Sequence, residues 1–356
     1  MLRRTLLALV VSLAVAAQAA EKLVGGPFVV NATGRRATVV WVTQTSEARL
    51  GEAPDKLAAA SPVLKTERIT FAGLKAGATY YYDVLGRDDG KGRFKTPPAG
   101  PAAFRFVAFG DTRTRHDVHA RVIQAVVKTE PDFVIHTGDL VADGDVAEQW
   151  PVFFSIEKEL LNKTVLFPSL GNHERNSRYF YEFFDLMVGY YSFDWGSAHF
   201  SVVNSDIGNA APTQAGREQF WKEQTRWLED DLARSQKADL RFVVLHNPPF
   251  TAVKRRQGPP GPLQQQWVPL FEKYKVHAVF TGHDHNYQHH LHNGVRYVVT
   301  GGGGAPLYPV DGPIPGITQK VESVENFVQV DVNGKKARLQ ALTPDGRLID
   351  AIEFNP

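Results

Sequence analysis

The sequence contains no cysteine, and this absence excludes several chemistries at once. Disulfide bonds, thiolate zinc clusters, a cysteine nucleophile and lipid attachment through cysteine are all ruled out. Any bound metal ion must therefore be held by oxygen and nitrogen atoms. Export without disulfides is compatible with a bacterial periplasm, although a lack of cysteine does not by itself fix the compartment.

An excess of charge of one sign is also missing. The chain has 40 basic and 38 acidic residues, and Arg3 and Arg4 alone account for the difference. A clustered basic excess is the usual mark of a nucleic-acid-binding surface. We therefore expect no nucleic-acid partner, while a nucleotide substrate is not excluded.

Long hydrophobic runs are absent apart from residues 6–17, which follow Arg3 and Arg4. This run is shorter than the roughly 20 residues that span a bilayer, and the small residues of Ala17-Gln18-Ala19 close it. The pattern predicts that residues 1–20 are a removed export signal and that the protein is periplasmic or secreted without a stable membrane anchor. A retained anchor is the alternative.

Residues 21–97 contain short strand patterns at 38–42, 67–71 and 79–84, separated by Gly, Pro and Asn turns. Residues 74–82, Leu-Lys-Ala-Gly-Ala-Thr-Tyr-Tyr-Tyr, resemble the turn and tyrosine-bearing strand of fibronectin type III domains. We therefore expect a small all-β sandwich here. It serves either as a packing support or as a module for a substrate or partner.

The proline-rich connector at residues 97–101 continues neither a strand nor a helix, so we place a domain boundary there, with a second domain at 98–356. The pattern then becomes β-α-β, with strands at 104–109 and 133–136 around a helix that carries valines at helical spacing. The tail predicts an antiparallel meander with turns at Asn333-Gly334 and Asp345-Gly346. Further strands are expected at 165–168, 199–204, 240–246, 278–281 and 295–300, and a further helix at 219–235.

Five segments share one feature: an apolar strand ends, and Gly or Pro appears beside Asp, Asn or His. They are Gly110-Asp111, Gly138-Asp139, Gly171-Asn172-His173-Glu174, His246-Asn247-Pro248-Pro249 and Gly282-His283-Asp284-His285. A lone Gly-Asp is usually a turn, and a lone strand-end histidine is usually a packing residue. Open α/β sheets, however, collect ligands at the carboxyl ends of their strands, so five such segments in one chain predict a common site.

Carboxylate oxygens combined with imidazole nitrogens suit iron, zinc or manganese better than calcium, which prefers oxygen alone. Two metal ions a few ångström apart need a shared carboxylate. Such a pair can activate a water molecule and hold the oxygens of an in-line phosphoryl displacement. The pattern therefore predicts a dinuclear site for phosphoester hydrolysis.

Residues 104 to about 310 resemble the calcineurin-like metallophosphoesterase superfamily and, within it, the purple acid phosphatases. The run from Gly282 to Tyr287 and the fibronectin-like segment ahead of the catalytic part sharpen this resemblance. It implies a four-layer α/β/β/α sandwich preceded by a small β-sandwich. It also implies two metal ions and phosphomonoester hydrolysis by direct attack of a metal-bridging hydroxide.

Motif by motif, the resemblance implies that Asp139 bridges both metals and that Asn172 and His173 lie at the substrate. His173 would not be a ligand, and its imidazolium can stabilise charge on the phosphate or protonate the leaving oxygen. The remaining ligands would be Asp111 and His285 at the first metal, and Asn172, His246 and His283 at the second.

The sequence departs from the family at two positions of the first metal. Arg113 stands where many members have a histidine, and Ala142 stands where purple acid phosphatases have a tyrosine. We therefore expect a protein that is not purple, whose first metal is bound more weakly or is completed by water, phosphate, Asp143 or Asp145. Arg113 is expected to grip a phosphate oxygen, the alternative being a surface arginine paired with an acid.

The other histidines and the glycine run receive structural interpretations first. We expect His136 and His199 to be packing residues in strands, and His116 and His119 to face solvent near a helix start. The cluster His289-His290-x-His292 either tunes substrate binding or binds nickel or zinc adventitiously. Residues 301–304, four glycines without the Lys and Ser/Thr of a P-loop, predict a close-packed loop near the site.

Two alternative functions remain open. A phosphodiesterase for cyclic nucleotides, phospholipid head groups or nucleic-acid ends would use the same site, and the loops at 208–216 and 254–266 would set the pocket width. A binding protein with a decayed site is the other alternative, motivated by Arg113. The decayed site would hold at most one metal ion per chain.

Overall fold

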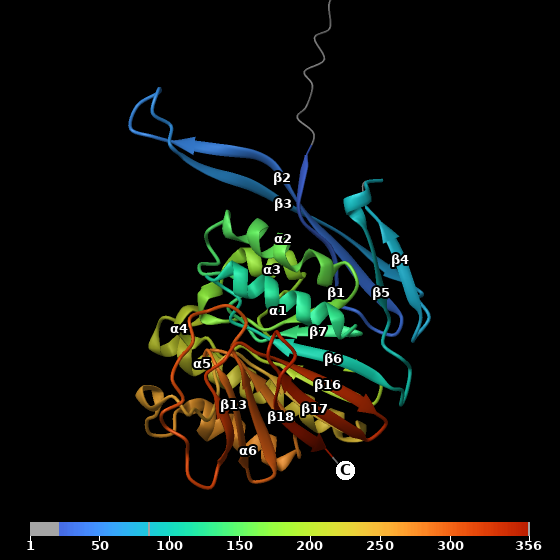
Figure 1. Ribbon diagram of the computed structural model, residues 1–356, viewed down its shortest axis with the longest axis vertical. Helices are drawn as coiled ribbons and strands as arrows, with labels where there is room; N and C mark the ends of the chain where they lie inside the picture. Colours follow the sequence, from blue (N-terminus) through green and yellow to red (C-terminus); the bar gives the residue numbers. More distant parts are fainter. Residues whose placement is uncertain (1–20, 85, 355–356) are drawn as a thin grey trace, which may run out of the picture.

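The computed structural model describes residues 21–84 and 86–354, which form two large β-sheets with helices on their outer faces (Figure 1). The first sheet has nine strands in the order β18-β17-β16-β6-β7-β8-β1-β2-β3 and the second has seven in the order β15-β13-β14-β12-β11-β10-β9. The strands of the first sheet are β1 (Lys22–Val30), β2 (Arg36–Leu50), β3 (Ala59–Ala72), β6 (Phe104–Phe109), β7 (Phe133–His136), β8 (Val165–Pro168), β16 (Phe327–Asn333), β17 (Lys336–Leu342) and β18 (Leu348–Phe354). Those of the second are β9 (Tyr191–Trp195), β10 (Ala198–Val202), β11 (Leu240–Val244), β12 (Ala278–Thr281), β13 (Tyr287–His292), β14 (Val295–Thr300) and β15 (Thr318–Glu322).

The two sheets stack face to face on an aromatic core. Phe106 of β6 packs edge-on against Phe200 of β10 and Phe280 of β12, with ring centroids 5.3 and 5.7 Å apart. Separate apolar clusters lie between the first sheet and α1–α3, and between the second sheet and α5–α6. The predicted four-layer α/β/β/α sandwich is therefore confirmed. The helices are α1 (His116–Lys128), α2 (Gln149–Leu161), α3 (Arg178–Phe184), α4 (Ile207–Ala210), α5 (Gln214–Arg234) and α6 (Val268–Lys273).

The N-terminal region consists of strands, as predicted, but its strands are shared with the rest of the molecule. β1 pairs in parallel with β8, with Val29 opposite Val165, so β1–β3 extend the first sheet. β4 (Thr79–Asp83) and β5 (Lys91–Lys95) form a separate hairpin, whose Tyr80 and Tyr82 pack on the core cluster that includes β1 and β2. The division of the chain into domains at residue 97 stays a prediction, because the sheet continues across it.

A hydrogen bond closes the tyrosine-bearing turn of this region. The backbone N–H of Lys75 donates to the hydroxyl oxygen of Tyr80 at 2.8 Å. A tyrosine that bonds the backbone a few residues upstream is a feature of immunoglobulin-like β-sandwiches, where it fixes a corner between strands. The long β2–β3 hairpin extends beyond the body of the molecule (Figure 1).

The predicted β-α-β unit, the later strands and the C-terminal meander all form. Val118, Val122 and Val126 face the core from α1, because helical spacing places them on one side. The helix α5 begins earlier than predicted, since the Thr213 hydroxyl caps it by accepting from the Gly216 N–H at 3.1 Å.

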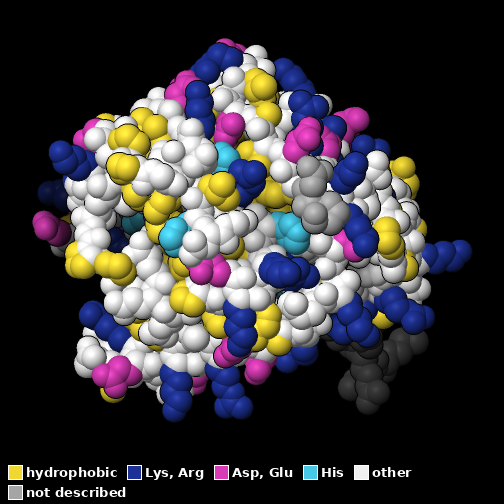
Figure 2. All heavy atoms as spheres, turned by 90° about the horizontal axis from the view of Figure 1, so that it is seen from below, with side chains coloured by type: hydrophobic (Ala, Val, Ile, Leu, Met, Phe, Trp, Pro, Cys, Tyr) yellow, Lys and Arg dark blue, Asp and Glu magenta, His cyan; other side chains and the backbone are white. Residues whose placement is uncertain are grey.

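The predicted export signal at residues 1–20 lies outside the described residues. No helix in the described part of the chain is long and apolar enough to cross a membrane. The face of the molecule seen from below carries basic and acidic side chains side by side (Figure 2), as the balanced composition predicts.

Candidate metal centre

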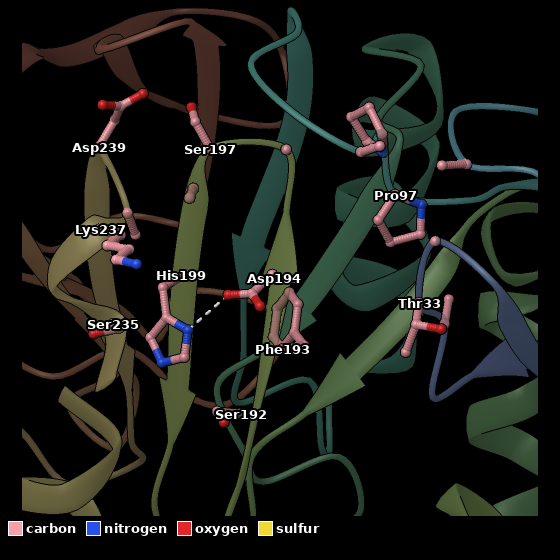
Figure 3. A pocket seen from close by; sticks show the side chains of 18 of the residues that line it. Thr33, Pro97, Ser192, Phe193, Asp194, Ser197, His199, Ser235, Lys237 and Asp239 are labelled. Atoms are coloured by element: carbon pink, nitrogen blue, oxygen red, sulfur yellow. Dashed lines mark hydrogen bonds and ion pairs between the residues drawn. The ribbon is translucent and has the colours of Figure 1, made fainter. Parts of the chain in front are cut away.

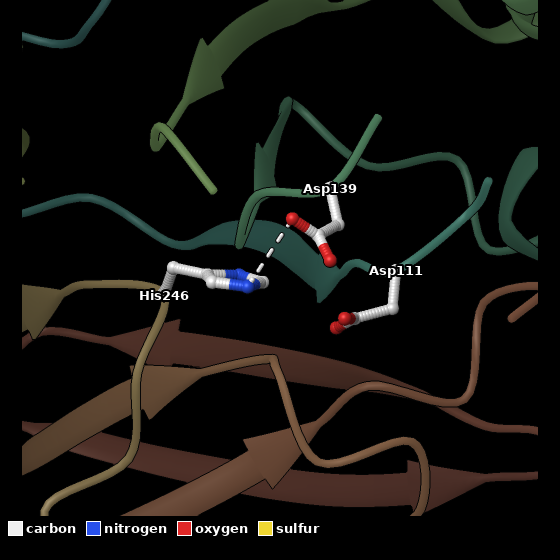
Figure 4. Close-up of side chains that lie close together, drawn as sticks. All are labelled: Asp111, Asp139 and His246. Atoms are coloured by element: carbon white, nitrogen blue, oxygen red, sulfur yellow. Dashed lines mark ion pairs between the residues drawn. The ribbon is translucent and has the colours of Figure 1, made fainter. Parts of the chain in front are cut away.

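The predicted ligands come together at the carboxyl ends of strands from both sheets. Asp111 and Asp139 follow β6 and β7 of the first sheet, and His246 follows β11 of the second (Figure 4). One ligand atom from each of these three residues lies within 4.8 Å of the others. Asn172 follows β8, and His283 and His285 follow β12.

One half of the centre gathers the four residues predicted for the second metal. The Nε2 atom of His246 lies 3.3 Å from Oδ1 of Asp139 and 3.1 Å from Oδ1 of Asn172. The same Nε2 lies 3.2 Å from Nδ1 of His283. These four donor atoms therefore converge on one small volume.

The other half gathers the residues predicted for the first metal. Nε2 of His285 lies 3.4 Å from Oδ1 of Asp111. The Arg113 guanidinium lies on this side, with Nε 3.4 Å from Oδ2 of Asp139 and Nη2 3.4 Å from Nε2 of His285. Asp139 thus directs Oδ1 to the half with His246 and Oδ2 to the half with Arg113.

Backbone carbonyls fix which nitrogen of each histidine is free. Nδ1 of His246 donates to the carbonyl of Thr137 at 2.8 Å, and Nδ1 of His285 donates to the carbonyl of Pro306 at 2.7 Å. In the neutral form of each ring Nε2 is then the atom without a proton, and it faces the carboxylates. Histidines that bind metals are commonly oriented in this way.

The backbone of the ligand loops is strained and tightly packed. Asp111, Asp139 and His283 have φ of 56°, 58° and 68°, a left-handed region that non-glycine residues adopt uncommonly. A Cβ on Gly282 would lie 2.4 Å from Oδ2 of Asp111, and one on Gly171 would lie 2.3 Å from Oδ1 of Asp139. These glycines are therefore required for the ligands to approach one another.

The donor set fits metal ions. Asp111 and Asp139 are fully buried side by side, and a buried carboxylate pair needs positive charge nearby. Burial acts to lower the pKa of His246, but Asp139 and Asp111 outweigh it and raise the pKa. Burial and the neighbouring His246 lower the pKa of His283 well below its usual value. The close pair of imidazole nitrogens and the two carboxylates form a set that bound cations would satisfy.

Glu174 has a structural part in the centre that the sequence analysis did not assign. Its buried carboxylate accepts hydrogen bonds from the N–H groups of Asp139, Leu140 and Gly171 at 2.9, 2.7 and 2.7 Å. Burial and the charge of Asp139 raise the pKa of Glu174. This side chain ties the Asp139 loop to the Asn172 loop.

His173 lies at the open side of the centre. Its Nδ1 donates to the carbonyl of Ala142 at 2.7 Å, and its Nε2 lies 3.9 Å from Oδ2 of Asp139. The ring is 29 % exposed, so a substrate can reach Nε2. Asp143 is paired with Arg175 at 3.1 Å and Asp145 is exposed, so neither of them contacts the first half of the centre.

The predicted burial is confirmed for three of the other histidines and is wrong for one. His136 and His199 are buried in strands and His116 is exposed, as expected. The expectation that His119 faces solvent is wrong, because α2 packs against α1 and Nε2 of His119 lies 2.7 Å from Oε1 of the buried Glu157.

The histidine cluster of β13 does not converge on one point. His289 bonds Asp350, His290 bonds Thr318, and His292 lies 3.5 Å from Glu272. Successive side chains of a strand point to opposite faces, so the three rings cannot hold one metal ion together. The four glycines at 301–304 form a buried loop, as predicted, with the Gly303 N–H donating to the Gly110 carbonyl at 3.0 Å.

A pocket of about 990 Å³ lies elsewhere, between the β1–β2 turn, the proline connector and β9–β10 (Figure 3). Its lining includes His199, which lies between Asp194 and Asp231. None of the predicted metal ligands lines it. The pocket is therefore separate from the candidate metal centre.

Residues 104–287, more than half of the 356-residue chain, match the family model for calcineurin-like phosphoesterases. The chain belongs to this family. The match covers every predicted metal ligand, from Asp111 to His285. The relatives and solved structures similar to this chain include purple acid phosphatases.

The relatives are distant. Purple acid phosphatase 22 of Arabidopsis thaliana is 26% identical over 245 residues, which cover 63% of this chain and 53% of the relative. An uncharacterized protein of Mycobacterium tuberculosis is 25% identical over 241 residues, covering 55% of this chain and 45% of the relative. This chain thus matches about half the length of these curated relatives.

Among solved structures, purple acid phosphatase PPD1 from yellow lupin seeds superposes with a TM-score of 0.71 at 17% identity. The superposition covers 92% of this chain and 74% of the lupin chain. At this identity the likeness establishes the fold alone. The fold therefore extends over nearly the whole chain, including the N-terminal strands.

Proposed function

We propose that the protein hydrolyses phosphomonoesters at a dinuclear metal centre. The observation that carries this proposal is the placement of Asp139, whose two carboxylate oxygens face separate groups of donors. Asp111, Asp139 and His285 would hold the first ion, and Asp139, Asn172, His246 and His283 the second. The nitrogen and oxygen donors suit iron, zinc or manganese, which would supply Lewis-acid charge and lower the pKa of a bound water.

The chain's own residues supply the remaining parts of the reaction. The Arg113 guanidinium, 15 % exposed and 3.4 Å from both Asp139 Oδ2 and His285 Nε2, would bind a phosphate oxygen. The carbonyl of Ala142 holds His173 by Nδ1, which directs Nε2 to the open side. From there His173 would donate a proton to the leaving oxygen. Asn209 of α4 donates to the carbonyl of Asn172 at 3.1 Å. The segment at 208–216, which contains Asn209, would therefore border the substrate.

Hydrolysis of para-nitrophenyl phosphate and of its bis-ester tests the proposal. The purified protein, loaded with iron, zinc or manganese, is compared with His173→Ala and Asp139→Asn, and with His116→Ala as an exposed-histidine control. We expect monoester turnover that both site variants lower by at least about 100-fold and the control leaves unchanged. Preferential bis-ester turnover would select a phosphodiesterase, and no metal-dependent turnover with at most one ion per chain would favour a decayed site.

We also propose that the protein is exported to the periplasm or the medium. The proposal rests on the charged start, the apolar run at 6–17 and the small residues that follow it. Mass spectrometry of the protein recovered from cells and medium should give a mature chain that begins near Glu21. A recovered chain that still carries residues 1–20 would contradict export by cleavage.

A further inference from the structure

The outer edge of the first sheet is a long and exposed strand. The strand β3 has 14 residues, stands last in the sheet order and, within the described residues, pairs with β2 alone. Strands of globular proteins usually have about 3 to 10 residues. No residue from 60 to 72 is buried, whereas residues 37–43 of β2 are buried throughout. The backbone N–H and C=O groups on the outer side of β3 therefore offer a template for a further strand.

The odd-numbered side chains of β3 form an exposed face with a mixed character. Val63, Ile69 and Phe71 are 45%, 50% and 44% exposed. Successive side chains of a strand point to opposite faces, so Lys65 and Glu67 lie on the same face between these apolar residues. Lys65 donates a hydrogen bond to the Glu67 carboxylate. The face therefore carries two opposite charges at its centre and apolar side chains on either side.

The opposite face of β3 is attached to the body of its own chain. Leu64 packs on the apolar cluster that lies between the first sheet and α1–α3. Nε of Arg68 lies 3.2 Å from Oδ1 of Asp185, just beyond α3. The strand is therefore fixed in place although its edge and its odd-numbered face are exposed, and the hairpin that it forms with β2 projects from the molecule (Figure 1).

The sequence of β3 is complementary to itself in one antiparallel register. In a two-fold symmetric pair of identical strands, residues that lie opposite each other have numbers with a constant sum and point to the same face. With Thr66 on the two-fold axis, Lys65 lies opposite Glu67 of the second copy, and Val63 lies opposite Ile69. Thr66 is also at the middle of β3, so this register pairs the two strands over nearly their whole length.

The neighbouring symmetric registers are unfavourable. With Lys65 on the axis the two copies of Lys65 face each other, and with Glu67 on the axis the two copies of Glu67 do so. Like charges directly opposite each other destabilise a strand pair. Pro62 has no backbone N–H, but in the register centred on Thr66 it lies opposite Thr70, near the strand ends, where one hydrogen bond at most is lost in each copy. Charge complementarity therefore selects this register.

We propose that the protein forms a two-fold symmetric dimer in which the β3 strands of two copies pair antiparallel about Thr66. The pairing joins the two nine-stranded sheets into one continuous sheet. Symmetry repeats the pair of Lys65 and Glu67 on both sides of the axis, and each pair is flanked by one of Val63 and Ile69. The proposal is independent of the proposed function, because β3 carries none of the predicted metal ligands.

Sedimentation equilibrium of the purified protein and its charge variants tests the pairing. The unmodified protein should be a dimer that dissociates on dilution. Lys65→Glu and Glu67→Lys, each alone, place like charges opposite each other twice per dimer, so we expect each to raise the dissociation constant at least about 10-fold. Lys222→Glu, on the exposed side of α5, is the matched control and should leave the dissociation constant unchanged.

A mixture of the two single variants separates pairing from misfolding. One strand then carries two negative charges and the other carries two positive charges, so Lys65→Glu and Glu67→Lys should form a mixed dimer about as stable as the unmodified one. The mixed dimer can form only if both variants are folded. A protein that stays monomeric, which would leave the edge to a strand of another protein, would overturn the proposal. A dimer that neither single variant weakens, or a mixture that forms no mixed dimer, would also overturn it.

Cysteine cross-linking tests the register, because the chain has no cysteine of its own. The two copies of Thr66 would lie about 5 Å apart between Cα atoms, within the range of a disulfide. The two copies of Thr70 would lie eight residues apart along the strands, roughly 27 Å. Under mild oxidation Thr66→Cys should form a disulfide-linked dimer on a non-reducing gel, and the matched Thr70→Cys should not. Equal linking in the two variants, or none in Thr66→Cys, would overturn the register.

Discussion

The molecule contains two clusters built around a buried histidine and a buried aspartate, and their hydrogen-bonding states are opposite. In the pocket beside β9 and β10, both nitrogens of His199 bond carboxylates, Nδ1 to Asp194 at 2.7 Å and Nε2 to Asp231 at 2.9 Å (Figure 3). Ser192 and Ser201 donate their hydroxyls to the same Asp231. Each N–H of His199 and each serine hydroxyl in this cluster has a carboxylate acceptor. Because Asp231 belongs to α5, the cluster joins this helix to the second sheet without needing a ligand.

In the candidate metal centre the balance of donors and acceptors is the reverse. His246 and His285 give their N–H to backbone carbonyls, and their other nitrogens face two buried carboxylates and a third histidine. Arg113 is the single arginine or lysine that forms an ion pair with Asp139 within the described chain. The comparison teaches that burial and residue type do not separate a structural cluster from a metal site, whereas an excess of acceptors does.

Removal of one imidazole from each cluster should give the largest difference between the two clusters. We expect His246→Ala to lose at least one metal ion per chain, and to lower kcat/KM for para-nitrophenyl phosphate by more than about 100-fold, because residues that only orient a ligand already contribute 10- to 100-fold. His199→Ala should keep its metal and lose about 3 kcal/mol of unfolding free energy, since it removes the imidazole that bonds the buried Asp231. Elemental analysis and urea unfolding check both. Equal metal loss in the two variants would refute the distinction.

The two buried glutamates give a second, smaller test. The Glu174 carboxylate accepts hydrogen bonds from backbone N–H groups of the ligand loops, and in Glu174→Gln an amide NH₂ group would face some of these donors instead. We therefore expect the affinity for metal ions to fall roughly 10- to 100-fold. Glu157→Gln is the matched control, because Glu157 is equally buried but bonds His119 away from the ligand loops. It should lower stability and leave metal affinity unchanged. Competition with a chelating dye measures the affinity, and a similar loss in both variants would remove Glu174 from the centre.

The pH dependence of stability should separate the clusters more finely. Burial acts to lower the pKa of His199, but the bonds with Asp194 and Asp231 raise the pKa to about 9, above the value near 6.5 of an unfolded chain. A raised folded-state pKa adds stability that is complete below pH 6.5 and is lost as pH rises through about 9. The loss should reach up to about 3 kcal/mol. Arg234, 3.9 Å from Asp231, also faces the pair and keeps its charge throughout this range.

Urea unfolding at pH 6, 7.5 and 9 measures this loss. The unfolding free energy of the unmodified protein should fall across the range, and His199→Gln should fall less. If both proteins show the same slope, His199 is not the group responsible.

The repeated pattern of strand, glycine and polar residue made the centre predictable from the sequence. Asp111, Asp139 and His283 each follow a glycine because the chain turns sharply where strands end, and the crowding at Gly171 and Gly282 explains why no other residue type fits. Glu174 belongs to one of these motifs, but the pattern indicates no role for it. The hydrogen bonds that its side chain accepts come from backbone N–H groups, and every residue type except proline carries such a group, so the sequence does not reveal them.

The fold was less predictable where an element's position depends on distant partners. The aromatic-rich helix α2 was not expected, and its packing on α1 is what buries His119. The composition of β13 indicates a histidine cluster and gives no sign of a strand. It forms a strand because it pairs with β14 and β15. The pairing of β1 with β8 joins segments that are far apart in the sequence, so no local pattern could indicate that the first sheet crosses residue 97.

The smallest expected effect concerns a polar contact that neither cluster contains. Tyr80→Phe removes only the hydroxyl that accepts from the Lys75 N–H, and we expect it to cost about 1 kcal/mol, the usual net contribution of one hydrogen bond. Tyr81→Phe is the matched control, because Tyr81 is the next residue of β4 and its side chain is largely exposed. Urea unfolding of both variants measures the difference, and elemental analysis should find the metal content of each unchanged. Equal stabilities would mean that the turn does not depend on this bond. A loss of metal in Tyr80→Phe alone would show that the N-terminal strands and the metal centre are coupled through the shared first sheet.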